Sequence, residues 1–257
     1  MKYPHLTRIL SAEFPKLKID ETTRDLDKIG MILINGKLMT IEEFLASKNF
    51  IVAGDLDLNF NEEITSLPEG LKVGGELDLR GTKITSLPEG LEVGGGLNLR
   101  FTKITSLPKG LKVRGYLDLW RSKITSLPKG LKIKGRLDLR NTPITSLPEG
   151  LEVGEDLYLM GTDITSLPED LKVGGELDLR GTKITSLPED LEVGKDLWIT
   201  DTPITFLPKG LKVGKDLWIY DTSITSLPED LRVGGDIVVN DPDEIQCSEE
   251  LRKKLTK

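Results

Sequence analysis

Two tryptophans, Trp198 and Trp218, occur twenty residues apart in the same K-D-L-W-I context, and Tyr220 follows the second of them at strand spacing. Large aromatic side chains on a polar surface serve as anchors in binding sites. Tryptophans flanked by aspartates can also stack on sugar rings and accept hydrogen bonds from their hydroxyls. These residue types therefore indicate noncovalent recognition, of a protein or of a carbohydrate.

Residues for catalysis or metal binding are scarce. The single cysteine, Cys247, excludes an internal disulfide framework and a thiolate cluster, and the lone His5 leaves little for a zinc site or a histidine base. Aspartates are numerous, but a glycosidase needs two carboxyls with separated pKa values across a cleft. The segment 30–37, GMILINGK, has the wrong glycine spacing for a phosphate-binding loop. We expect no enzyme activity, no metal and no cofactor.

The composition is that of an acidic, soluble protein: 30% of the 257 residues are charged and the net charge is −7. This balance disfavours nucleic-acid binding through a basic surface. No secretory signal and no membrane span is visible, which predicts a cytoplasmic protein in the cell that makes it. Secretion as an effector and the oligomeric state stay open.

A short motif recurs along most of the chain. The segment I-T-[SF]-L-P begins at residues 64, 84, 104, 124, 144, 164, 184, 204 and 224, always twenty residues apart. A fixed short period indicates stacked units that bury a continuous core only together. The sequence therefore predicts a repeat solenoid.

Each repeat contains one clear strand signal. Leu77 and Leu79 alternate with polar residues, so we expect a short parallel β-strand whose leucines point inward and whose Asp78 points outward. Pro88 and Gly90 prevent a helix on the return path. That side of the coil is expected to be extended or polyproline-like, with at most a 3₁₀ turn.

The repeat L77-x-L79-x-x-T82-x-I84-x-x-L87-P88 resembles the short leucine-rich repeat L-x-L-x-x-N-x-[LI]-x-x-L-P of YopM-like and IpaH-like bacterial effectors. The resemblance implies a parallel sheet on the concave face, but Cys247 lies too near the end for an IpaH-like ligase domain. Two features depart from the pattern. Thr or Ser replaces the asparagine, which predicts a hydroxyl ladder, and a glycine such as Gly74 replaces the first leucine, which permits a tight corner or positive φ. A β-solenoid with square coils is the alternative fold.

Both ends of the stack need covering, since open layers expose apolar faces and strand edges. Residues 1–50 are predicted to form an α/β cap, a hairpin turning at Asn35-Gly36 and a helix opened by a Thr40/Glu43 capping box. Residues 51–243 form the solenoid of twenty-residue coils. Residues 244–257 are predicted to form a helical C-terminal cap beginning at Ser248.

The outward positions vary where the inward ones repeat. An aspartate column in the first half, offset by a neighbouring arginine column, is expected to form a solvated and self-neutralised face. In the second half aromatic residues replace it. The predicted binding residues are Trp198, Trp218, Tyr220, Tyr158, Met160, Asp196, Asp216, Asp201 and Asp221, with Phe101, Tyr116 and Trp120 as secondary candidates.

These patterns favour a non-enzymatic scaffold that binds a partner protein on its concave strand face. An acidic rim around aromatic residues suits a basic or amphipathic partner segment. A carbohydrate-binding solenoid that uses the Trp and Asp rows is the alternative.

Overall fold

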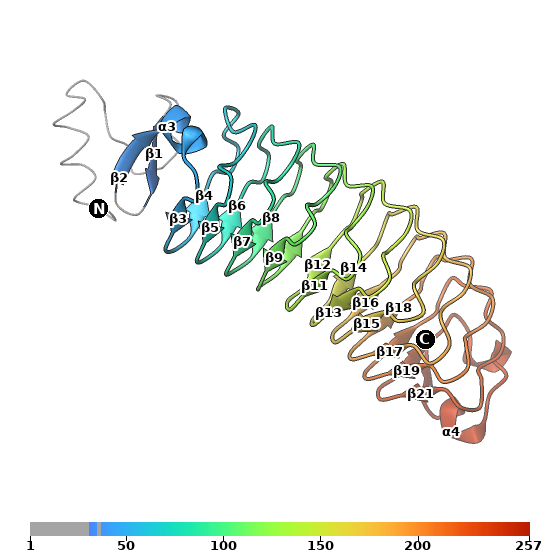
Figure 1. The fold of residues 1–257 in the computed structure, drawn as a ribbon. Helices are drawn as coiled ribbons and strands as arrows, with labels where there is room; N and C mark the ends of the chain where they lie inside the picture. The colour runs from blue at the N-terminus through green and yellow to red at the C-terminus, as the bar shows by residue number, and fades with distance from the viewer. Residues whose placement is uncertain (1–30, 35–36) are drawn as a thin grey trace, which may run out of the picture.

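The computed structural model describes residues 31–34 and 37–257. The chain forms an elongated parallel β-solenoid whose coils stack side by side along one long axis (Figure 1). A hairpin and helix α3 lie at one end of the stack, and helix α4 lies at the other. The repeat solenoid predicted from the twenty-residue period is therefore confirmed.

The predicted L-x-L strand is present in every coil and builds the large sheet, which has eleven parallel strands. Leu97 pairs with Leu77 on one side and Leu117 on the other, so equivalent positions stack in register. Its strands are β4 (Leu56–Asp57), β6 (Leu77–Asp78), β8 (Leu97–Asn98), β10 (Leu117–Asp118), β12 (Leu137–Asp138), β14 (Leu157–Tyr158), β16 (Leu177–Asp178), β18 (Leu197–Trp198), β20 (Leu217–Trp218), β22 (Ile237–Val238) and β23 (Leu255–Thr256).

Each coil also has a second strand, which the sequence did not reveal. It precedes the glycine corner and forms two further parallel sheets, of four and six strands. The first contains β3 (Ile51–Val52), β5 (Lys72–Val73), β7 (Glu92–Val93) and β9 (Lys112–Val113). The second contains β11 (Lys132–Ile133), β13 (Glu152–Val153), β15 (Lys172–Val173), β17 (Glu192–Val193), β19 (Lys212–Val213) and β21 (Arg232–Val233).

The core is a column of aliphatic layers. Leu137, Leu139 and Ile144 are completely buried, as are their equivalents in the neighbouring coils. The return path from Ile144 through Pro148 has no regular secondary structure, in agreement with the prediction. Because every layer touches the layers above and below, the coils stabilise one another.

The corner glycines are required by close approach, not by positive φ. A Cβ atom on Gly94 would lie 2.1 Å from the carbonyl oxygen of Gly74, and one on Gly194 would lie 2.0 Å from that of Gly174. Arg114 and Lys134 are consecutive exceptions in this column. There the second-strand sheet is interrupted, because β9 and β11 do not pair.

The threonine column bonds within each coil and forms no ladder between coils. The hydroxyl of Thr82 donates to the carbonyl oxygen of Leu79 at 2.7 Å, and Thr142 donates to Leu139 at 2.6 Å. These hydroxyls bond backbone carbonyl oxygens at the turn after the strands of the large sheet. In the leucine-rich-repeat pattern the same position is occupied by asparagine, whose side-chain amide bonds backbone groups. The expected ladder was therefore wrong, although the hydroxyls do bond turn backbone.

The N-terminal elements are an antiparallel hairpin of β1 (Met31–Ile34) and β2 (Lys37–Thr40), followed by α3 (Ile41–Ala46). The capping box is present: Glu43 N–H donates to the Thr40 hydroxyl at 3.0 Å, and Thr40 N–H donates to the Glu43 carboxylate at 2.9 Å. Phe44 of α3 is completely buried. The turn at Asn35-Gly36 and His5 lie outside the described residues.

The C-terminal segment is less helical than predicted. A 3₁₀ turn, η1 (Pro242–Glu244), precedes α4 (Glu249–Arg252), which Ser248 caps, and the chain then forms β23 beside β22. The Lys254 ammonium donates to the carbonyl oxygen of Val233, at the place where a further coil would supply a backbone N–H. The C-terminal segment therefore forms part of a further coil, which covers the last complete coil of the solenoid.

Candidate functional site

The outward face of the large sheet carries an Asp-x-Arg unit in three coils, at β6, β12 and β16. In β12 and in β16 the aspartate side chain is only 1% exposed and accepts the backbone N–H of the arginine two residues later, at 3.1 Å. Each arginine side chain returns to the same carboxylate in a bidentate ion pair, Arg140 to Asp138 and Arg180 to Asp178. The aspartates were expected to be solvated, but they are buried beneath their arginines, which ion-pair as predicted.

Three aromatic residues of the second half, Trp198, Trp218 and Tyr220, contact one another in sequence. Trp198 and Trp218 are parallel, with ring centroids 4.2 Å apart and an interplanar angle of 8°. Tyr220 meets Trp218 edge-on at 6.3 Å. On the side of the preceding coil, the Arg180 guanidinium lies over the Trp198 ring, 4.9 Å from its centroid. We call Arg180, Trp198, Trp218 and Tyr220 the aromatic stack.

Arg180 was missed by sequence reasoning. In the strand register Trp198 lies beside Asp178, so Arg180, two residues further along β16, is its diagonal neighbour. Diagonal neighbours on adjacent strands are within reach of long side chains, which allows a cation–π contact.

Hydrogen bonding is incomplete around the aromatic stack. Five buried side-chain atoms in the described residues have no hydrogen-bond partner, and three of them are Trp198 Nε1, Trp218 Nε1 and Thr200 Oγ1. Unpaired buried polar atoms lower stability by about 1–3 kcal/mol each. The Asp-x-Arg unit of β16 shows that the scaffold has a better-satisfied solution at these positions. Stability alone therefore does not explain the tryptophans.

The aspartates predicted to border the site have structural roles of their own. Asp196 accepts the backbone N–H of Asp216 at 3.0 Å, and Asp216 accepts that of Asp236 at 2.9 Å. Asp201 and Asp221 adopt left-handed φ values of 56° and 55°, a conformation that aspartate tolerates better than most residues. Both are exposed, and each follows a strand of the large sheet.

Tyr158 and Met160 do not join the aromatic stack. Asp178 lies between Tyr158 and Trp198 in the strand register. Tyr158 instead lies under Arg140, 5.0 Å from its guanidinium, and its hydroxyl donates to Asp156 at 3.2 Å. Burial, together with the nearby carboxylates of Asp156 and Glu176, raises the pKa of Tyr158 to about 12. The structure thus divides the predicted surface in two.

Of the secondary candidates, Phe101 and Trp120 contact each other, while Tyr116 has other partners. Trp120 contacts Phe101 edge-on, with ring centroids 4.9 Å apart, and the guanidinium groups of Arg100 and Arg121 lie over its ring, 4.6 and 5.1 Å from the centroid. Tyr116 lies under Arg136 at 5.0 Å and bonds Glu76 through its hydroxyl. These rings are therefore held by arginines, with Phe101 42% exposed.

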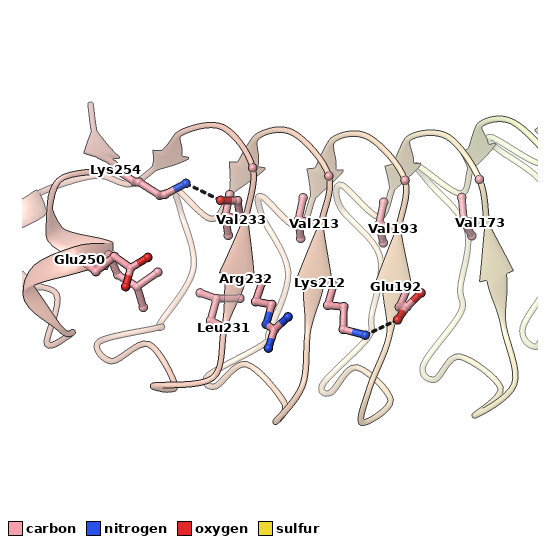
Figure 2. Close-up of a pocket in the computed structure, with 15 residues that line it drawn as sticks. Val173, Glu192, Val193, Lys212, Val213, Leu231, Arg232, Val233, Glu250 and Lys254 are labelled. Atoms are coloured by element: carbon pink, nitrogen blue, oxygen red, sulfur yellow. Dashed lines mark hydrogen bonds and ion pairs between the residues drawn. The ribbon is translucent and has the colours of Figure 1, made fainter.

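A hollow of about 570 Å³ lies beside the second strands near the C-terminus (Figure 2). It is lined by corner glycines, by the valines of β15 to β21 and by Leu251 and Lys254 of the cap. Glu192 and Lys212 pair across its wall, and Lys254 is occupied by Val233. It contains none of the predicted binding residues.

Asp118 provides a test of the buried carboxylate column. Burial, followed by repulsion from Asp138, raises the pKa of Asp118 above its ordinary value. A raised folded-state pKa adds stability at low pH, and this stability is lost as pH rises through that pKa. We therefore expect the wild-type melting temperature to rise relative to that of Asp118→Asn as pH falls from about 7 to about 4.

In the wild-type protein the Asp118 carboxylate accepts the backbone N–H of Trp120 at 3.1 Å. The side-chain oxygen of an asparagine can accept the same hydrogen bond, but asparagine does not titrate. Thermal melts of both proteins across this range give the comparison. A difference in melting temperature that stays constant, or that changes in the opposite direction, would contradict the burial of an ionised Asp118.

The strand arrangement is that of a parallel β-solenoid of the leucine-rich-repeat type. No family model and no curated protein matches the sequence. Among solved structures, the chain is similar to a leucine-rich-repeat protein of Leptospira interrogans, with 16% identity over 77% of this chain and 92% of that one. The TM-score is 0.20, so the fold assignment rests on the strand arrangement described above.

Within residues 31–34 and 37–257, no group of three or more His, Cys, Asp or Glu side chains is arranged to hold a metal ion. In the same part of the chain, no helix is long and apolar enough to cross a membrane.

Proposed function

We propose that the protein is a recognition scaffold without catalytic activity, which binds a partner protein on the outward face of the large sheet at the aromatic stack. The observation that carries the proposal is the replacement of the Asp-x-Arg unit by Trp198 with Thr200 and by Trp218 with Tyr220. These residues are partly exposed or leave polar atoms unpaired, and they disturb a copied scaffold without improving its core.

The charge around the aromatic stack favours a partner segment with basic residues. Asp201 and Asp221 lie exposed beside it, and no described basic side chain pairs with them within 4 Å. Such rim charges accelerate association with a partner of opposite charge. The resemblance to YopM-like repeats supports a role in binding signalling proteins of another cell.

The geometry of the stack disfavours the carbohydrate alternative. Sugar rings pack on the faces of aromatic side chains. One face of Trp198 is covered by Arg180 and the other by Trp218. A ligand on the sheet therefore meets the edges of the Trp198 ring, which suit the side chains of a protein better than a pyranose.

The test replaces the tryptophan pair position in β18 by the Asp-x-Arg unit that other coils of the same scaffold carry. Trp198→Asp combined with Thr200→Arg installs the Asp-x-Arg unit of β16 in β18. We expect the melting temperature to be maintained, because the new pair satisfies its own polar atoms, while affinity falls by more than about 30-fold, as for a binding hot spot. The ligands are peptides selected on the wild-type protein from a random displayed library, and affinities are measured by calorimetry.

Trp120→Ala is the matched control, since it removes a tryptophan from the same sheet face outside the aromatic stack. It should leave the selected peptides bound. Unchanged peptide affinity in the Trp198→Asp/Thr200→Arg variant would refute the proposed site. Binding of a defined oligosaccharide on a glycan array, abolished by the same variant, would support the carbohydrate alternative instead.

A further inference from the structure

The charge of the chain is distributed very unevenly. Residues 101–140, two consecutive repeats, contain eleven lysines and arginines and two aspartates, a net charge of +9 in a chain whose total is −7. The next repeat, residues 141–160, contains four acidic residues and no basic one. We call the eleven residues the basic band: Lys103, Lys109, Lys112, Arg114, Arg121, Lys123, Lys129, Lys132, Lys134, Arg136 and Arg140.

The exposed charge of these two repeats is entirely positive. Both aspartates, Asp118 and Asp138, are 1% exposed and lie beneath arginines. Three lysines at the borders pair with glutamates of the flanking coils, Lys112 with Glu92, Lys129 with Glu149 and Lys132 with Glu152. Within the described part of the chain, no carboxylate lies within 4 Å of Lys103, Lys109, Arg114, Lys123 or Lys134.

The scaffold departs from its own rules at the same place. Arg114 and Lys134 occupy the glycine column, and the pairing between β9 and β11 is lost there. Phe101 and Arg121 adopt left-handed φ values of 58° and 55°, at positions that are glycine in other coils. Left-handed φ is unfavourable for such residues, and strained residues concentrate at functional sites. Arg114 and Lys134 therefore place charged side chains where other coils have glycine.

We propose that the basic band is a second binding site, which takes an acidic, extended segment of another protein lying along the coils. Arg114 and Lys134 lie at the corner before β10 and β12, and Arg121 follows β10. Arg114 and Arg121 lie on opposite sides of β10, seven residues apart in the chain, so they are at most about 25 Å apart, and an extended segment of about seven residues would reach both. Its carboxylates would pair with the ammonium and guanidinium groups that lack partners.

Two other anionic ligands fit less well. Single-stranded nucleic acid binds by stacking its bases on aromatic faces, but the guanidinium groups of Arg100 and Arg121 already lie over the Trp120 ring. An anionic membrane is flat and wide, whereas the band spans two coils, about 10 Å, and is followed by the acidic repeat 141–160. A narrow polypeptide crossing the rod avoids these flanking carboxylates.

The decisive variant restores the repeat. Arg114→Gly with Lys134→Gly removes two unpaired charges and returns glycine to the corner. We expect its affinity for a labelled oligoglutamate peptide of about ten residues to fall at least about tenfold at about 0.15 M salt, with no loss of melting temperature. Fluorescence anisotropy measures the binding, and the aromatic stack is untouched, so failure here is distinguishable from failure of the proposed function.

The matched control is Lys195→Gly with Lys215→Gly, which makes the same charge change at a neighbouring corner position of two other coils. It should change the affinity for oligoglutamate less than about twofold. The proposal is overturned if both double variants weaken oligoglutamate binding equally, or if the wild-type protein does not bind it. It is also overturned if labelled oligothymidylate or phosphatidylserine vesicles bind the band more tightly than the peptide at the same salt.

Discussion

Replacing Leu137 by alanine is expected to lower the free energy of unfolding by about 2–5 kcal/mol. The side chain is completely buried in β12, and its neighbours in register are Leu117 and Leu157. Removing it leaves a cavity shared by three coils, and the coils cannot close it without shifting their strands out of register. Urea unfolding followed by circular dichroism provides the measurement.

The control for Leu137→Ala has to come from a fully exposed position. Lys129→Ala lies in the preceding segment of the same repeat and should change the unfolding free energy by less than about 1 kcal/mol, since its ion pair with Glu149 is on the surface. Asp138 would not serve, because it is buried and bonded to Arg140. Equal losses from Leu137→Ala and Lys129→Ala would contradict the assignment of inward and outward faces.

The solenoid was predictable because its determinants are local and repeated. Leu77 and Leu79 alternate with polar residues in one coil, and the same columns recur at a fixed spacing, which defines both strand and stack. The second strand at Lys72–Val73 was not predictable in this way. It contains a single inward residue, so it has no periodicity, and it exists because the glycine corner lets neighbouring coils approach and bond.

The candidate site was predictable in composition but not in arrangement. The sequence placed Trp198 and Trp218 on adjacent coils of one face. It could not show that they stack face to face, because that depends on side-chain rotamers and on Arg180 from the preceding coil. The net charge of −7 for the whole chain concealed the basic band of residues 101–140, so the sequence analysis did not predict it. Charge counted repeat by repeat would have revealed it.

Truncating the chain after residue 243 is expected to have the largest effect on solution behaviour. The deletion removes β23 and the residue before it. The backbone carbonyls of Lys254 and Thr256 accept the N–H groups of Ile237 and Val239, at 2.7 and 2.9 Å. It also removes Leu251, which is buried in the same core as the coils. An unpaired parallel strand edge over an open apolar layer associates with other chains. We expect concentration-dependent oligomers in analytical ultracentrifugation.

Two point variants separate the contributions of the cap. Leu251→Ala should lower the melting temperature while keeping the protein's oligomeric state, because β23 still covers the edge of β22. Lys254→Met removes only the ammonium that donates to the Val233 carbonyl oxygen, so its effect should be smaller. If the chain truncated after residue 243 kept the oligomeric state and melting temperature of the full chain, the last coil would be stable without its cover. The edges of β21 and β22 would then be too short to cause association of the chains, and the C-terminal segment would have a role other than covering them.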